Sequence, residues 1–433
     1  MINDATRHFI SLHRNDDVRM LALKGAANDV DMPMALQQIQ GWQTARTKLP
    51  SWAECAGIVF PPHLSMEQCS SELTARYKAS LIAERLKAGE ETAAHTSSRD
   101  GYSVVDLTGG FGIDFFFIAQ ACEGIYPGCG AVYVEQQSHL CTMAEHNFRA
   151  LALEAEVKNC DSIAFLQNMP HAHVVMVDPA RRSSSGAKVV MLGDCAPNIL
   201  EICKLMLSKA HMVVVKLSPM LDWHLAVEQI NEAAGRAVVS EVHVVAVKNE
   251  CKELLMVMQG QHDGTPPTMT CANHDGAGWQ LMSYRQDETA VLITIADVTG
   301  TVGSVLLEPN AAVMKAGCFA LLCERYGVRA LATNSHLFIA AGGEGGGILP
   351  WHHFPGRALR IVAVSKMNKR ELGEALKGID RANVAVRNFP MGADALRKKL
   401  HLKDGGTTFV YGTTAMVKGK PANIVIVAEQ MAR

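Results

Sequence analysis

The sequence predicts an α/β protein in which a mostly parallel β-sheet with an antiparallel last strand follows a helical N-terminal domain and precedes an α+β C-terminal domain. Two observations predict the sheet. Between residues 99 and 260, short apolar runs alternate five times with amphipathic stretches, which is the pattern of parallel strands joined by crossover helices. The next two apolar runs are separated only by a KNECK turn, so they form an antiparallel hairpin.

Length and composition predict four regions along the chain. At 433 residues the chain exceeds the usual size of one hydrophobic core. We expect a helical domain over 1–98, the α/β domain over 99–260, a connecting α+β region over 261–354 and an α+β domain over 355–433. Apolar residues at helical spacing predict helices in the first region. Within it, Ser65 followed by Gln68 is typical of a capping box and predicts a helix start.

The α/β domain should begin with five strands, each followed by a helix. These strands are SVVDL, AVYVE, AEVKN, HVVMVD and MVVVKL, and the hairpin strands that follow are EVHVVAV and ELLMVM. Parallel strands end at one edge of the sheet, and open α/β sheets bind ligands at that edge. The residues that end these strands are therefore candidate ligand contacts.

The last two regions should mix strands and helices. After a polar connector over 260–278, we expect strands at WQLMSY and AVLITIADV, one helix over 311–327 and a flexible loop at GGEGGG. The final region predicts, in order, strand ALRIVAVS, helix KRELGEALKG, strand NVAVRNF, helix ADALRKKL and strands TFVYGTT and NIVIVAE.

Composition argues against several classes of protein. No window holds eighteen uncharged apolar residues, so no membrane-spanning helix is expected. Charges near the N-terminus stand where a signal peptide would need an apolar core, and we expect a cytoplasmic protein. The twelve cysteines include no Cys-x2-Cys pair, so neither a zinc ribbon nor a disulfide framework is predicted. No dense group of acids and histidines indicates another metal.

Charge is distributed unevenly along the chain. The net charge is −2, yet residues 355–433 carry fifteen Lys and Arg against six Asp and Glu. A basic segment beside an acidic body indicates a polyanionic partner for one domain. A solvated charged surface is the alternative interpretation.

The stretch VVDLTGGFGID, residues 104–114, places an acid and a glycine-rich turn between a strand and a helix. Such glycines let backbone N–H groups approach a ligand that a Cβ atom would exclude. Dinucleotide-binding loops need a third glycine where this sequence has Phe115. Asp106 closes the strand, and its charge repels a pyrophosphate but attracts an ammonium group. The stretch therefore favours a cofactor with an amino group over NAD.

This stretch resembles motif I of the class I S-adenosylmethionine (SAM) methyltransferases, which have a Rossmann-like sheet. The resemblance implies SAM as cofactor, with contacts from Asp106, Thr108, Gly109, Gly110, Phe111, Gly112 and Asp114. The next strands add Glu135 with Gln136 for the ribose hydroxyls, and Asp161 with Ser162 for the adenine amino group. Taken singly, such acids as Glu135 and Asp161 are more often solvated turn residues, but ligand candidates at four successive strand ends favour a binding role.

The stretch DPARR resembles motif IV of methyltransferases that act on nucleic-acid bases. The resemblance implies that Asp178 and Pro179 hold an exocyclic amine with its lone pair toward the methyl group. Arg181 stands where a base-stacking aromatic residue is expected. Arg181 and Arg182 can stack on a base, clamp an RNA phosphate or pair with a nearby acid. No cysteine lies in DPARR or in MVVVKLSPM, which disfavours methylation of a pyrimidine carbon.

Further blocks extend the resemblance over most of the chain. They are FPPHLSMEQCSSELTARYK, VMVDPARR, KLSPMLD, EVHVVAVKNECKELL, LEPNAAVMKAG, NSHLF and RNFPMGADALRKKLHLKDGGTTFVYGTT. The chain is similar to bacterial class I SAM methyltransferases with a THUMP-like C-terminal domain. This resemblance implies methylation of a nitrogen of an RNA base, with RNA as the partner. Two alternatives stay open: a SAM enzyme for a protein or small molecule, and a non-catalytic RNA-binding protein with a vestigial cofactor pocket.

Two further groups of residues are assigned binding roles, the first by the resemblance and the second by charge. In the similar family, the segment before motif I folds over the methionine end of SAM, which implies contacts from Gln68, Ser71 and Lys78. A purely structural helix is the alternative. Basic side chains of the last region are expected to bind RNA phosphates. They are Arg387, Arg397, Lys398, Lys399 and Lys403.

The block LEPNAAVMKAG has two interpretations. Glu308, Asn310 and Lys315 can form a second polar site. Alternatively, Pro309 and Asn310 only start a helix, and we favour this helix start. No pattern in the sequence predicts the oligomeric state.

Overall fold

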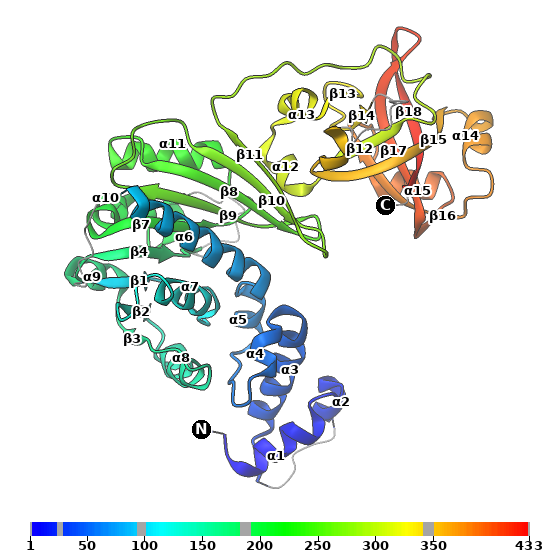
Figure 1. The fold of residues 1–433 in the computed structure, drawn as a ribbon. Helices are drawn as coiled ribbons and strands as arrows, with labels where there is room; N and C mark the ends of the chain where they lie inside the picture. Colours follow the sequence, from blue (N-terminus) through cyan, green and yellow to red (C-terminus); the bar gives the residue numbers. More distant parts are fainter. Residues whose placement is uncertain (1, 24–28, 93–100, 182–191, 341–349, 432–433) are drawn as a thin grey trace. The chain divides into compact units, whose positions relative to one another are not determined.

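The computed structural model describes residues 2–23, 29–92, 101–181, 192–340 and 350–431. The chain divides into two compact units, residues 1–242 with 254–265 and residues 243–253 with 266–433. The predicted division into four regions stays a prediction. Figure 1 shows the N-terminal helices in blue and the C-terminal strands in orange and red.

Helices make up the N-terminal part of the first unit, as predicted. They are α1 Asp4–His13, α2 Val18–Leu23, α3 Met32–Lys48, α4 Pro50–Glu54, α5 His63–Gln68 and α6 Glu72–Thr92. Side-chain caps fix where α1 and α3 begin, because free N–H groups at a helix N-terminus need acceptors. Asn3 accepts a hydrogen bond from the N–H of Thr6 in α1, and Asp31 accepts one from Met34 in α3.

The segment between α5 and α6 differs from the capping-box prediction. Ser65 lies inside α5, which already begins after Pro62. The next helix starts instead after Ser71, whose hydroxyl accepts a hydrogen bond from the N–H of Thr74. The turn between these helices carries Ser70, which contributes to the site described below.

The predicted sheet is present, with nine strands in the order β11-β10-β8-β9-β7-β4-β1-β2-β3. The strands are β1 Tyr102–Asp106, β2 Gly130–Glu135, β3 Glu156–Asn159, β4 Ala172–Val177, β7 Ala210–Leu217, β8 Val239–Val247, β9 Glu250–Gln259, β10 Thr268–His274 and β11 Trp279–Arg285. β1 pairs in parallel with β2 and β4, β2 with β3, and β4 with β7. β9 is antiparallel to β7, so the prediction of a mostly parallel sheet with an antiparallel end is confirmed.

Helices connect the parallel strands, as the alternating pattern predicted. They are α7 Ile113–Glu123, α8 Ser138–Ala150, α9 Ser162–Asn168, α10 Ile199–Lys209 and α11 Trp223–Ala234. The central strands are apolar because a parallel sheet is covered on both faces. Val105, Val132, Val175 and Val214 are accordingly fully buried.

A small two-stranded sheet follows β4. It consists of β5 Ala180–Arg181 and β6 Cys195–Ala196, with the 3-10 helix η1 Leu192–Asp194 before β6. The backbone of Arg181 belongs to β5, whereas its side chain and the whole of Arg182 lie outside the described residues. The expected roles of these two arginines therefore stay predictions.

The second unit contains a seven-stranded sheet in the order β13-β14-β12-β15-β18-β17-β16. Its strands are β12 Val305–Pro309, β13 Val328–Ala330, β14 Phe338–Ala340, β15 Gly356–Lys366, β16 Arg381–Arg387, β17 Lys403–Val417 and β18 Lys420–Gln430. Its helices are α12 Ala311–Ala316, α13 Phe319–Tyr326, η2 Pro350–His353, α14 Lys369–Ala375 and α15 Ala393–Lys399. Apolar side chains on both faces form cores, one around Ile361 and Tyr411 and one around Leu396 and Val410. The predicted α+β C-terminal domain is confirmed.

Two predictions for the connecting region are wrong. The apolar run AVLITIADV is not a strand, since Val291 is 77% exposed and only an isolated bridge joins Thr294 to Ala330. The helix expected over 311–327 is two helices, because Gly317 adopts a left-handed φ of 77° that ends α12.

Four strands of this region, β10, β12, β13 and β14, were not predicted, and one predicted loop is not described. β10 lies within the expected polar connector, where Met269, Cys271 and Ala272 are buried although polar residues separate or flank them. The GGEGGG stretch lies outside the described residues.

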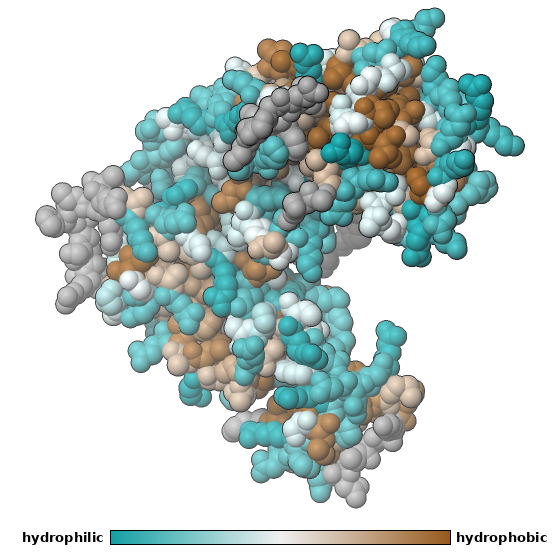
Figure 2. Space-filling model, turned by 45° about the vertical axis from the view of Figure 1, so that its right-hand side comes forward, coloured by the Kyte–Doolittle hydropathy of each residue, from teal (hydrophilic) through white to brown (hydrophobic). Residues whose placement is uncertain are grey.

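The exterior is largely hydrophilic, with apolar patches between the hydrophilic side chains (Figure 2). All twelve cysteines are free, and most of them are buried. Burial explains why they can remain unpaired small apolar side chains. In the part of the chain that the structure describes, no helix has the length and apolar character needed to span a membrane.

Candidate active site

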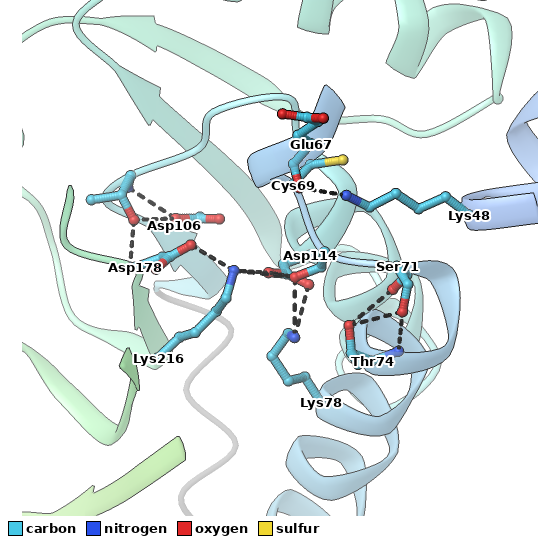
Figure 3. A network of polar contacts seen from close by, with 12 residues as sticks. Lys48, Glu67, Cys69, Ser71, Thr74, Lys78, Asp106, Asp114, Asp178 and Lys216 are labelled. Carbon is cyan, nitrogen blue, oxygen red and sulfur yellow. Dashed lines mark hydrogen bonds and ion pairs between the residues drawn. The ribbon is translucent and has the colours of Figure 1, made fainter. Parts of the chain in front are cut away.

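A network of polar side chains lies at the carboxyl ends of β1, β4 and β7 (Figure 3). Asp106 ends β1, Asp178 follows β4, and Lys216 lies one residue before the end of β7. Adjacent parallel strands end at the same edge, so residues far apart in the sequence meet here. The turn before α6 and the start of α7 complete the network with Ser70 and Asp114.

Asp106 is joined to Asp178 through one hydroxyl group. Oδ1 of Asp106 accepts hydrogen bonds from the backbone N–H of Thr108 at 2.9 Å and from its hydroxyl at 3.3 Å. The N–H of Asp178 donates to the same hydroxyl oxygen at 2.7 Å. The other oxygen of Asp106, Oδ2, makes no hydrogen bond to any described residue. Asp106 is 4% exposed, and this burial raises its pKa to about 7.

Beside Asp106, two lysines and two aspartates form a chain of alternating charges. The ammonium of Lys216 lies 2.6 Å from Oδ2 of Asp178 and 3.4 Å from Oδ2 of Asp114. Lys78, which is fully buried, lies 3.2 Å from Oδ1 of Asp114. Burial alone would raise the pKa of Asp114, but Lys78 and Lys216 hold it below its usual value. The carboxylate of Asp114 therefore holds the two cations together.

Of the three glycines in the turn between β1 and α7, two are in close contact with aromatic rings and one is not. A Cβ atom on Gly109 would lie 2.1 Å from the ring of buried Tyr133, and one on Gly112 would lie 2.8 Å from Phe148. Gly110 has a left-handed φ of 54°, and a Cβ there would meet only the carbonyl of Thr108 at 3.8 Å. Gly109 and Gly112 are thus required by packing, while Gly110 faces open space.

Phe111 of the same turn is part of the core. It is 5% exposed, and its ring lies 5.1 Å from that of Trp52. This contact anchors the turn on the N-terminal helices. A direct ligand contact by the Phe111 side chain does not follow from this geometry.

A second group of polar residues lies at the ends of β2 and β3. Oε2 of Glu135 accepts a hydrogen bond from the N–H of Gly110 at 3.0 Å. Gln136 donates to Oδ2 of Asp161 at 2.8 Å, while Oδ1 of Asp161 caps α9. Ser162 is the buried first residue of that helix. The structure thus brings these four residues together, with acceptor positions left on both carboxylates.

Two residues of the first network were not predicted. Lys216 could have been found by the strand-end rule, since it lies near the end of MVVVKL. Ser70, which donates to Asp114 at 2.7 Å, has no signal in the sequence because its role depends on the turn between α5 and α6. Of the residues suggested for the methionine end, Lys78 joins the network, Ser71 caps α6, and Gln68 is exposed at the end of α5.

The arginines predicted to bind RNA are engaged with acids in the second unit. Arg387 lies 2.8 Å from Glu308, and Arg397 lies 2.7 Å from Asp394 and 3.4 Å from Asp404. Lys398, Lys399 and Lys403 are exposed. The lysines remain available to a polyanion, whereas the two arginines also serve the fold.

The LEPNAAVMKAG block starts a helix, as favoured. Asn310 caps α12, and its side chain accepts a hydrogen bond from the N–H of Val313. Glu308 is buried, with its carboxylate bound by the hydroxyl of Tyr411 at 2.8 Å and by Arg387. Among the described residues, no group of three or more His, Cys, Asp and Glu is arranged to hold a metal ion.

The sheet order and the strand-end acids define the class of fold. The parallel strands with antiparallel β9 form the class I methyltransferase sheet that the motifs predicted. In the second unit, residues 356–430 match a family model described as THUMP domain-like, and residues 306–342 match one described as a ferredoxin-like domain. No curated protein matches the sequence. The chain therefore has a class I methyltransferase fold with a THUMP-like C-terminal domain.

Among the solved structures that match, the following one does so over the whole chain. The crystal structure of a "putative methyltransferase" from Porphyromonas gingivalis W83 is 27% identical, with a TM-score of 0.77 and coverage of 100% of both chains. The ribosomal protein L11 methylase from Lactobacillus delbrueckii subsp. bulgaricus is 12% identical over 44% of this chain and 80% of its own, with a TM-score of 0.29. TrmK of M. capricolum, in complex with S-adenosyl-homocysteine, is 10% identical over 43% of this chain and 68% of its own, with a TM-score of 0.29. The full-length match confirms the resemblance on which the predicted fold was based.

Proposed function

We propose that this chain is a SAM-dependent methyltransferase that methylates a nitrogen of an RNA base. The proposal rests mainly on one observation. A buried carboxylate, Asp106, has one oxygen without a hydrogen bond and is joined through Thr108 to the backbone N–H of Asp178, whose carboxylate is more exposed. Such a pair provides one acid for a cofactor amine and one for a substrate amine.

The residues at this edge of the sheet offer a contact for the amino group, the ribose and the adenine of SAM. The ammonium group of the cofactor would pair with Oδ2 of Asp106, since a buried unpaired carboxylate favours a cation. The ribose hydroxyls would donate to Glu135, which already lies against the open side of Gly110. Asp161 and Ser162 at the end of β3 would contact the adenine. Bound there, SAM would supply an electrophilic methyl group.

Asp178 is the residue that would receive the substrate. Its side chain is 44% exposed, so a base can reach it, and Lys216 holds its Oδ2 at 2.6 Å. The carboxylate accepts a hydrogen bond from the N–H of the target, which orients the nitrogen lone pair, and takes up the proton released on methylation. Lys216 thus acts as a positioning residue for Asp178.

The RNA assignment is supported by the second unit. Its THUMP-like match covers residues 356–430, a range within the basic C-terminal segment. Lys398, Lys399 and Lys403 are exposed there and would contact phosphates, which gives affinity that depends on salt but little on sequence. Selectivity for a particular base would then depend on Asp178 and its surroundings.

The proposed function has a direct test. Purified protein is incubated with labelled SAM and RNA from cells that lack the gene, and the nucleosides are analysed by mass spectrometry. We expect one methylated nucleoside that is absent from the deletion strain and present in the parent. Calorimetric titration with SAM separates the alternatives, because a vestigial pocket would give no heat. An enzyme for a protein or small molecule would bind SAM but leave RNA unlabelled.

Two alanine substitutions in the glycine turn should differ in effect. Gly109→Ala is expected to destabilise the protein by about 1–3 kcal/mol or more, because its Cβ would overlap the buried Tyr133 ring. Gly110→Ala should cost only about 1–2 kcal/mol for its left-handed backbone, yet weaken SAM binding at least roughly tenfold by filling the open side of the turn. Urea unfolding and calorimetry measure the two effects. Unchanged SAM affinity in a folded Gly110→Ala protein would argue against this cofactor position.

SAM binding should strengthen as pH rises through about 7, where buried Asp106 ionises. Below that pH the cofactor ammonium must displace a proton, so affinity should fall by up to roughly tenfold per pH unit. Calorimetry in buffers of different ionisation enthalpy should detect proton release near pH 6. Asp106→Asn should bind SAM more weakly and without this pH dependence. A wild-type affinity that does not change between pH 5.5 and 8 would contradict the assignment of Asp106.

Asp106 should affect the stability of the protein in the opposite sense: stability should fall as pH rises, whereas SAM affinity should increase. Its pKa in the folded protein, about 7, lies above the ordinary value of 3.8. The favourable contribution of protonated Asp106 is therefore complete below about pH 4 and is lost as pH rises toward 7. Bound SAM should restore stability in the upper part of this range.

A further inference from the structure

A second polar pocket, with a volume of about 890 Å³, lies wholly within the second unit. The turn between β8 and β9, the strands β11 and β15 and the ends of β10 and β12 line it. The lining side chains that matter here are Lys248, Asn249, Asn273, Gln280, Glu308 and Arg357. This volume is in the range of small-ligand sites. None of the residues assigned above to methyl transfer lines it.

The pocket offers two cations. The ammonium of Lys248 is exposed and has no partner among the described residues. The Arg357 guanidinium lies 4.5 Å from the ring centre of Phe409 and is 43% exposed, with Glu308 at 3.5 Å. Stacking on Phe409 fixes the plane of the guanidinium and leaves N–H groups for another anion.

The buried acid of the pocket does not cancel these cations. Glu308 is bound by Arg387 at 2.8 Å and by the hydroxyl of Tyr411 at 2.8 Å. Its charge is thus already balanced by Arg387 before Arg357 is counted. The other lining acid, Asp275, accepts hydrogen bonds from the backbone N–H groups of Ala277 and Gly278. With Arg387 counted, three cations face the two acids Glu308 and Asp275, so an anionic group of a ligand would meet net positive charge near Lys248 and Arg357.

Side-chain amides form the rest of the polar lining. Oε1 of Gln280 accepts hydrogen bonds from Asn310 at 3.2 Å and, more weakly, from Asn273 at 3.5 Å. Asn249 accepts a bond from the N–H of Ala311 at 2.7 Å, while its own NH₂ group makes no bond to a described residue. Amides held in place by one another present fixed donors and acceptors. Planar amides of this kind match the edges of nucleobases.

The turn that carries Lys248 and Asn249 has an unusual backbone. Both residues have left-handed φ values, 50° and 63°, a conformation that asparagine tolerates but lysine adopts rarely. A two-residue hairpin turn of this kind favours Asn-Gly or Gly at these positions. Glycine suits the backbone at position 248 better than lysine does, so replacing Lys248 by glycine removes the side chain without straining the turn.

We propose that this pocket binds one nucleotide of a single-stranded segment of RNA, with Lys248 and Arg357 at its phosphate and the amides of Asn249 and Gln280 at its base edge. The proposal rests on the proposed function, because that function makes RNA the substrate. It adds a recognition site to the exposed lysines of the C-terminal domain. Unlike those lysines, the pocket can enclose a base and select a strand that is not paired.

Lys248→Gly tests the proposal with little danger of misfolding, because glycine suits its left-handed φ. Lys418→Gly is the matched control: Lys418 is also an exposed lysine with a left-handed φ, 49°, in a two-residue hairpin turn of the same unit, but it does not line the pocket. Both full-length variants should unfold at the wild-type temperature or above. The probe is a short fluorescent single-stranded RNA, titrated without SAM at several salt concentrations.

We expect Lys248→Gly to bind this RNA roughly five- to tenfold more weakly and to lower the slope of log K against log salt by about one. Lys418→Gly should bind like wild type. RNA containing 4-thiouridine should crosslink, on illumination, to peptides that carry Gln280 or the 248–249 turn. Equal binding and equal slopes for both variants, or crosslinks found only elsewhere, would overturn the pocket assignment, as would a wild-type protein that binds no RNA.

The outcome for the pocket can be separated from the outcome for the proposed function. If RNA is methylated while Lys248→Gly binds like wild type, the pocket proposal is wrong and the methyltransferase proposal stands. If Lys248→Gly loses affinity but no RNA is ever methylated, the pocket stands and the proposed activity is wrong.

Discussion

Replacing Asp178 with alanine is expected to lower methyl transfer to RNA by on the order of 10²- to 10⁴-fold, the usual contribution of a positioned acid or base. The variant loses the acceptor for the substrate N–H, while Asp106 and Glu135 keep their contacts with the glycine turn. SAM affinity should therefore change by no more than about threefold, since a positioned catalytic group acts mainly on the transition state. Single-turnover transfer of a labelled methyl group measures the first effect, and calorimetry measures the second.

The control for Asp178→Ala is Glu228→Ala, an exposed acid on α11 of the same unit. It should transfer methyl groups at the wild-type rate. Asp178→Asn keeps the shape and one acceptor oxygen but loses the charge opposite Lys216, so an intermediate rate is expected. If Asp178→Ala turns over like wild type, Asp178 is not the residue that receives the substrate.

The second large effect concerns stability. Asp114→Asn is expected to lower the free energy of unfolding by about 3–5 kcal/mol, because it leaves buried cations without their shared carboxylate. Lys78 is fully buried, and Lys216 is 13% exposed. Lys216 retains Asp178 as a partner, so most of the loss should come from Lys78. Urea unfolding followed by circular dichroism measures the difference.

A compensating substitution tests the cause of this loss. Lys78→Met removes the stranded charge and should recover most of the stability when it is added to Asp114→Asn. Asp194→Asn, at an exposed aspartate of the same unit, should change stability by no more than about 0.5 kcal/mol. An unchanged unfolding midpoint for Asp114→Asn, or no recovery in the double variant, would show that Asp114 does not hold the lysines together.

The strand-end acids could be predicted from the sequence because their positions depend on local pattern. An apolar run followed by an acid identifies Asp106, Glu135 and Asp178, and parallel strand order brings their edges together. The hairpin after the fifth crossover was predictable for the same reason, since only a short turn separates its strands. The turn between them lies within the predicted KNECK stretch but comprises only Lys248 and Asn249, because β9 already begins at Glu250.

The ion pairs of several charged residues could not be predicted, because they depend on packing between distant segments. The resemblance assigned Lys78 to the methionine end of SAM, but nothing in the sequence indicated that it is fully buried against Asp114. Arg387 was assigned to RNA from local charge, while its partner Glu308 lies 79 residues earlier in the chain. A cluster of basic residues in the sequence does not reveal which of them already have acids beside them.

Short apolar runs were misleading in the connecting region. The pattern of AVLITIADV satisfies the strand template, but among the described residues it meets β13 only at the isolated bridge between Thr294 and Ala330, and no strand pairs along its length. Strand formation needs such a partner, since an unpaired strand leaves its backbone groups to water. Gly317 was a local signal that the helix over 311–327 would end early, because glycine after a helix favours the left-handed conformation seen there.

The structure of the protein in complex with S-adenosyl-homocysteine tests the central claim most directly. We expect the amino group of the ligand about 3 Å from Oδ2 of Asp106 and its ribose hydroxyls on Glu135, with the Asp178 carboxylate facing the sulfur side of the pocket. A ligand bound elsewhere, or an edge of the sheet that remains closed to it at saturating concentration, would contradict the assignment of this site to SAM.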